Sequence, residues 1–249
     1  MSVPALFGAL LRRELTSRAS AQRMIVVVAV GVLSGFLAGG VAPSRPPGRP
    51  GALENALASY EHLSGWIIGM LAGLRCIATL HDDQRRGWLT QLFAFGVRRD
   101  AYLAQLAAAT LLAGWVDYGL ALGSFAAVHA AAAGTAPLGR MLGVLPGALL
   151  WTGAVMALAA ACGVVLNERT RARFSLAALL LLPYVGVFLY AFMNDDRPPP
   201  RAVIVLVGWV VPRWLVAPTL VAAGQLLLYT SLALILALLL APARIERSS

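Results

Sequence analysis

The sequence predicts an all-α integral membrane protein with six transmembrane helices. Apolar residues make up 59% of the chain, only 12% of its residues are charged, and its mean hydropathy is +0.77. Soluble domains carry about 25% charged residues, so lipid is the expected solvent for most of this surface. The apolar residues also gather in long runs, and arginines lie between these runs.

Residues 1–23 are expected to form an amphipathic helix that lies on the membrane surface. Apolar residues at helical spacing form one face, namely Val3, Leu6, Phe7, Leu10, Leu11 and Leu15. Arg12, Arg13 and Arg18 belong to the other face, as in a helix that contacts lipid headgroups. A signal peptide is the alternative, but its charges would come earlier and residues 37–42 offer no clear cleavage site.

Residues 24–249 are expected to form one transmembrane domain. The six spans are predicted at 24–41, 57–80, 102–133, 141–166, 174–193 and 219–240. Residues 44–51 and 194–201 are rich in proline and are predicted loops, because proline lacks an amide hydrogen that a helix in lipid needs. Residues 198–218 are predicted to form an external hairpin. Its apolar run is short, so a re-entrant, an interfacial and a spanning segment all stay open.

The arginines are unequally divided between the two sides that six spans define. Thirteen lie on the side of the chain ends and of residues 81–101, six lie on the other side, and Arg75 lies within the second span. Short arginine-rich loops stay in the cytoplasm, so both termini and residues 81–101 are expected there. Anionic lipids explain these arginines, and no nucleic-acid partner is expected. Arginine-only basic usage with abundant alanine indicates a GC-rich bacterial genome, and the expected location is the bacterial inner membrane.

The chain contains no lysine, so it cannot be a conventional P-loop ATPase, which needs a lysine on the nucleotide phosphates. Cys76 and Cys162 both lie in apolar runs and have no metal-binding spacing. No set of nucleophile, base and metal ligands is recognisable. No catalytic residue, metal site or cofactor is therefore expected in this chain.

Two charged residues fall inside predicted spans. Asp117 lies near the middle of the third span, where a carboxylate is costly. It is expected either to serve function or to be satisfied by a neighbouring helix, Tyr118 or Ser124. Arg75 lies near the cytoplasmic end of the second span, and it is expected either to snorkel toward water or to pair with Asp117. The helix rise separates the two residues by roughly 10 Å in depth.

Residues 81–101 form the longest charged interruption between two apolar runs. Leu89, Leu92 and Phe93 share one face of a helix, and Gly96 supplies a break. We therefore predict a short amphipathic helix at about 82–95, at the boundary of the membrane.

This stretch resembles the cytoplasmic loop between the second and third spans of ABC-2 type transporter permeases. The residues that carry the resemblance read Arg86-Gly87-Trp88-Leu89-Thr90-Gln91-Leu92, followed by Gly96-Val97-Arg98-Arg99. Asp83 stands at the acidic position of the family pattern, Gly96 stands where proline is usual, and Arg86 stands where glutamate is common. The Asp82-Asp83 pair is also similar to haem-exporter-like permeases.

The resemblance implies that the short helix is a coupling helix, which docks in a groove of a separate cytoplasmic ATP-binding subunit. That subunit would hold ATP and Mg²⁺, and a second permease copy would pair with the first. The resemblance also implies a partner-binding surface that consists of Asp82, Asp83, Arg86, Gly87, Leu89, Gln91 and Leu92.

The expected function is therefore that of the permease subunit of an ATP-driven exporter. A membrane scaffold or assembly factor without a transport cycle is the alternative, and a neighbouring gene for a P-loop ATPase would favour the permease. The spans contain few polar residues, which favours a lipophilic or amphipathic cargo.

Overall fold

The structure is a computed structural model, and it describes residues 3–40, 52–133, 138–166, 168–193 and 220–245. Eight helices make up this part of the chain: α1 (Val3–Thr16), α2 (Arg18–Gly40), α3 (Ala52–Arg85), α4 (Trp88–Ala94), α5 (Arg99–Ala133), α6 (Leu138–Val165), α7 (Arg169–Met193) and α9 (Leu220–Ile245). The described residues contain no strand. The all-α prediction is confirmed for them.

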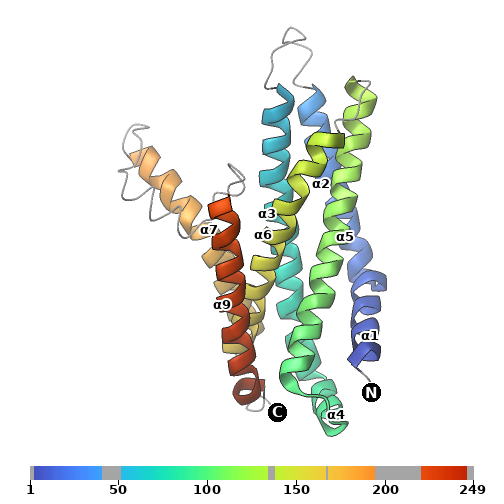
Figure 1. Ribbon diagram of the computed structural model, residues 1–249, viewed down its shortest axis with the longest axis vertical. Helices are drawn as coiled ribbons and strands as arrows, with labels where there is room; N and C mark the ends of the chain where they lie inside the picture. The colour runs from blue at the N-terminus through green and yellow to red at the C-terminus, as the bar shows by residue number, and fades with distance from the viewer. Residues whose placement is uncertain (1–2, 41–51, 134–137, 167, 194–219, 246–249) are drawn as a thin grey trace.

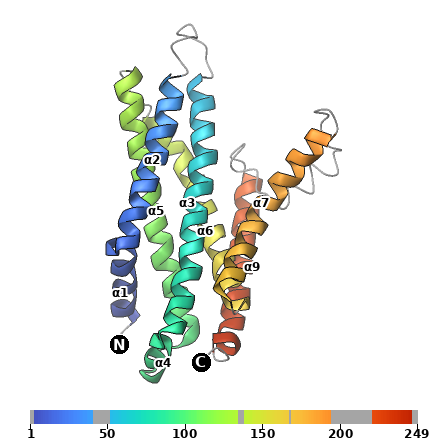
Figure 2. The same ribbon diagram turned by 180° about the vertical axis from the view of Figure 1, so that it is seen from behind.

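The long helices α2, α3, α5 and α6 run side by side along the long axis of the molecule (Figures 1 and 2). α2 packs on α5, α6 packs on both α3 and α9, and α7 leans away from the bundle toward its C-terminal end. The start of α1, the short helix α4 and the end of α9 all lie at one end of the bundle (Figure 1). The arginine count predicts that these three segments share one side of the membrane, and the structure brings them to one end of the bundle.

Three described helices are long and apolar enough to cross a membrane: Arg99–Ala131, Leu145–Val165 and Ala223–Ala243. A fourth candidate exists if the bent pair Pro4–Thr16 and Ser20–Gly35, with 59° between its parts, counts as one span. The protein is therefore a membrane-embedded helical protein. α3 and α7 cover the predicted spans at 57–80 and 174–193, but neither helix is among these candidates.

The N-terminal segment differs from the single surface helix predicted at 1–23. The helix breaks at Ser17, whose hydroxyl accepts a hydrogen bond from the amide of Ser20 at 3.2 Å. A serine in this position caps the start of the next helix, so α2 begins at Arg18. Leu6 and Leu10 of α1 are buried in the main core. The apolar face that was expected to enter lipid therefore packs against the protein's own helices.

Small residues let the long helices approach closely. Gly31 and Gly35 of α2 face α5, and a Cβ atom at Gly31 would overlap the carbonyl oxygen of Ala121. A Cβ atom at Gly73 of α3 would come within 3.1 Å of Val155 in α6. Small residues at helix contacts are typical of membrane bundles, where packing replaces the hydrophobic effect between helices.

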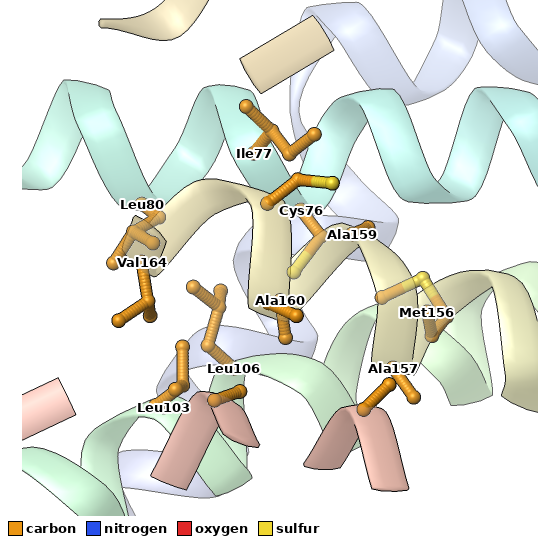
Figure 3. Close-up of a cluster of buried hydrophobic side chains, with 14 of the residues drawn as sticks. Cys76, Ile77, Leu80, Leu103, Leu106, Met156, Ala157, Ala159, Ala160 and Val164 are labelled. Atoms are coloured by element: carbon orange, nitrogen blue, oxygen red, sulfur yellow. The ribbon is translucent and has the colours of Figure 1, made fainter. Parts of the chain in front are cut away.

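The main core lies where α3, α5 and α6 meet (Figure 3). Its central side chains are Cys76, Ile77, Leu80, Leu103, Leu106, Met156, Ala157, Ala159, Ala160 and Val164. Large exposed apolar side chains, such as Ile25, Leu33 and Leu239, lie instead on the outer faces of α2 and α9. The hairpin predicted at 198–218 lies outside the described residues.

Candidate functional site

The helix predicted at about 82–95 is in fact two helical pieces joined by a glycine turn. α3 continues through Arg85, so Asp82 and Asp83 lie on its last turn, and α4 begins at Trp88. Gly87 between them has a φ of 67°, and Gly96 after α4 has a φ of 79°. This left-handed backbone favours glycine, because a Cβ atom would clash with the neighbouring carbonyl. Two short turns thus connect α4 directly to α3 and α5.

The inner face of α4 belongs to the core of the chain. Leu89 and Leu92 are only 3% and 4% exposed, and they pack in the same core as Leu6 and Leu10 of α1. In this conformation the chain's own core already covers both leucines, and their docking on a partner stays a prediction. The periodicity correctly identified an apolar face, but it could not say what that face contacts.

The outer face of α4, together with the turns on either side of it, carries charge and one large aromatic ring. Arg85, Arg86 and Gln91 are exposed, and Phe95 is 76% exposed. Arg98 is exposed too, and it donates to Asp100 of α5 at 2.7 and 3.1 Å. Of the residues predicted to bind a partner, Arg86 and Gln91 are thus on the open surface, whereas Leu89, Leu92 and Asp83 are buried.

Asp83 is the centre of an outer cluster, which consists of Arg13, Asp83 and Tyr102. Both terminal nitrogens of Arg13 donate to its carboxylate, at 2.8 and 3.0 Å, and the Tyr102 hydroxyl donates at 2.5 Å. The guanidinium of Arg13 also lies 5.6 Å from the ring centre of Trp88. The outer cluster therefore joins α1, α3, α4 and α5 beside the glycine turn.

Asp82 points elsewhere and accepts a hydrogen bond from Arg169 at 2.6 Å. This contact brings the start of α7 to the same end of the bundle as α4. His81 lies next to Asp82, just beyond the predicted second span, and is buried. Burial, together with the positive charges of Arg85 and Arg169, lowers the pKa of His81, which favours the neutral ring.

An inner cluster, which consists of Glu14, Arg23, Arg75 and Asp117, lies deeper in the bundle. The Nε atom of Arg75 donates to the Glu14 carboxylate, and its Nη2 atom donates to the hydroxyls of Ser17 and Ser20 at 2.8 and 3.0 Å. Thr79 also donates to Glu14, at 3.3 Å. Arg75 of α3 therefore holds the break between α1 and α2.

Arg23 of α2 completes the inner cluster. Its Nε atom lies 2.5 Å from the Asp117 carboxylate in α5, and its Nη1 atom lies 3.9 Å from Glu14. No described hydrogen bond or ion pair joins Arg75 to Asp117 directly, so the direct pair considered from the sequence is not formed. Arg75 does not snorkel to water either, because its guanidinium is held by Glu14. Asp117 is paired with a neighbouring helix through its Oδ2 atom, which is one of the alternatives that the sequence left open, whereas its buried Oδ1 atom has no hydrogen-bond partner among the described residues.

Glu14 and Arg23 were not predicted as site residues, although the sequence contains a signal for Glu14. It is the only acidic residue before position 54, and it follows Leu6 and Leu10 at intervals of four. An acid on the apolar stripe of a helix indicates a buried charge that needs a partner. No such signal marks Arg23, because arginines at the start of a span are common.

The described residues contain no group of three or more His, Cys, Asp and Glu side chains that could hold a metal ion. Both clusters pair acids with arginines, so their chemistry is that of attachment between helices. No protein-family model matches the chain, and no curated protein matches it either.

Proposed function

We propose that this chain is the permease subunit of an ABC-2 type transporter, which exports its substrate across a bacterial inner membrane. The observation that carries the proposal is the motif around Gly87 and Leu89, which resembles the coupling loop of that family. The membrane-embedded helices and the position of α4, beside the start of α1 and the end of α9, support it. A separate cytoplasmic subunit supplies ATP hydrolysis, and a second permease copy completes the path.

The outer face of α4 and the turns on either side of it form the docking surface in this proposal. Arg85, Arg86, Gln91 and Phe95 are exposed together at the corner where α3 turns into α5. Aromatic and arginine side chains are both enriched at protein–protein interfaces. Because two short turns join α4 to both long helices, a push on this face moves α3 and α5 together.

The first test is the double variant Arg86→Glu with Phe95→Asp. We expect retention of the ATP-binding subunit to fall at least about tenfold, because both changes lie at the centre of the proposed contact. Co-purification from membranes and ATPase stimulation in proteoliposomes measure this effect. Arg12→Glu is the matched control, because Arg12 is exposed on α1 and lies outside the docking surface.

Unchanged retention of the ATP-binding subunit by the double variant would contradict the assigned docking surface. If the wild-type protein retains no ATP-binding subunit at all, the chain is better explained as a membrane scaffold or assembly factor.

A further inference from the structure

The inner and outer clusters attach the same N-terminal segment to α3 and α5, the two helices that α4 connects. The outer cluster ties Arg13 of α1 to Asp83 of α3 and, through it, to Tyr102 of α5. The inner cluster ties Glu14 to Arg75 of α3, and Arg23 to Asp117 of α5. Each cluster therefore bridges the N-terminal segment, α3 and α5.

We propose that α1 and the first turns of α2 move together with α3, α4 and α5 when the ATP-binding subunit pushes on α4. The two charge clusters transmit this motion to them. This inference rests on the proposed function. It assigns a role to the inner cluster, whose members are positioning residues that act through the helices they join: Glu14, Arg23, Arg75 and Asp117.

The spacing of the two attachments favours transmission. Arg75 and Asp83 are eight residues apart on α3, which corresponds to about 12 Å along the helix axis. On α1 the two contacts come from the adjacent residues Arg13 and Glu14, so they hold the C-terminal end of α1 against two heights of α3. A tilt of α3 therefore moves this end of α1 with it.

The chemistry of the attachments points the same way. Taking charges out of water is costly, and well-packed apolar residues often stabilise a fold as well as a buried ion pair. The contact of α3 with α6 is built in that apolar way, from Gly69, Gly73, Ala159 and their neighbours. No ion pair between α3 and α6 is found in the described part of the chain. Buried charges thus distinguish the N-terminal attachment, where they fix one register.

The test removes both charges of an attachment at once, so that no unpaired charge stays buried. The two variants are Glu14→Gln with Arg75→Met, and Arg23→Met with Asp117→Leu. Glu168→Gln with Arg171→Gln is the matched control, because it removes an exposed ion pair at the start of α7. All three variants are purified with the ATP-binding subunit that co-purifies with the wild-type chain.

We expect both cluster variants to fold and to retain the ATP-binding subunit. We expect the stimulation of its ATPase activity to be at least about fivefold lower than in the wild-type protein. The control variant keeps its stimulation. Full stimulation in a folded variant would overturn the proposal, because the inner cluster would then be dispensable for transmission. Failure of both variants to fold would overturn it too, since it would assign the clusters to stability alone.

A second measurement needs no ATP-binding subunit. Spin labels at Gly8→Cys on α1 and Gln91→Cys on α4 occupy exposed positions, whereas the native Cys76 and Cys162 are buried. We expect one narrow distance distribution in the wild-type background and a broad one in either cluster variant. An unchanged distribution would overturn the attachment itself. If no ATP-binding subunit is found, the proposed function fails, while this distance still reports on the attachment.

Discussion

Asp82 and Asp83 are adjacent residues with different surroundings. The Asp83 side chain is 6% exposed and accepts three hydrogen bonds, whereas the Asp82 side chain is 38% exposed and accepts a hydrogen bond from Arg169. Breaking a buried pair leaves an uncompensated charge, but an exposed pair contributes little. The two positions therefore form a matched comparison.

We expect Asp83→Asn to lower the free energy of unfolding by about 1–3 kcal/mol, because Arg13 and Tyr102 lose their charged acceptor. We expect Asp82→Asn to change it by at most about 1 kcal/mol. Thermal unfolding in detergent measures both values. Equal losses in the two variants would show that burial does not separate these carboxylates.

At the scale of elements, the packing of α4 and the contact of α2 with α5 decide the local architecture. We expect Leu92→Ala to cost about 2–5 kcal/mol of stability, because the side chain fills the main core. Gln91→Ala, at the adjacent exposed position, serves as the control and is expected to stay within about 0.5 kcal/mol. Denaturant unfolding distinguishes them, and a neutral Leu92→Ala would mean that α4 does not pack as described.

The α2–α5 contact depends on a glycine that faces a backbone oxygen. We expect Gly31→Ala to destabilise the protein, because its Cβ atom would overlap the carbonyl of Ala121 and push the two helices apart. Gly123→Ala in α5 has no atom within 4 Å of the new Cβ, and it should be neutral or gain up to about 1 kcal/mol from helix propensity. Melting temperatures that follow the opposite order would contradict this contact.

At the scale of the whole molecule, the arrangement predicts which segments share one side of the membrane. Arg86→Cys and Arg171→Cys both lie at the α4 end, and Arg169 contacts Asp82 there. We expect an impermeant maleimide to label both cysteines in inverted vesicles and neither in spheroplasts. Labelling of the two positions from opposite sides would exclude the arrangement of helices described above.

Much of this fold could be predicted from the chain because its physical causes are local. Composition and the spacing of apolar runs indicate long helices in lipid, since about 20 apolar residues suffice to cross a bilayer. Gly96 was predicted as a break and has the left-handed φ that a break requires. The helix at 102–133 was likewise predicted within a few residues of α5, because its apolar run has clear ends.

Contacts between helices could not be predicted in the same way, because they depend on which faces meet in space. An apolar stripe on α1 or α4 fits lipid, a partner protein or the protein's own core equally well, and Leu6, Leu10, Leu89 and Leu92 all proved to be core residues. The partners of Arg75 and Asp117 were likewise open. Glu14 and Arg23 are distant from them in the sequence, and only the packing of α1 and α2 beside α3 and α5 brings the four charges together.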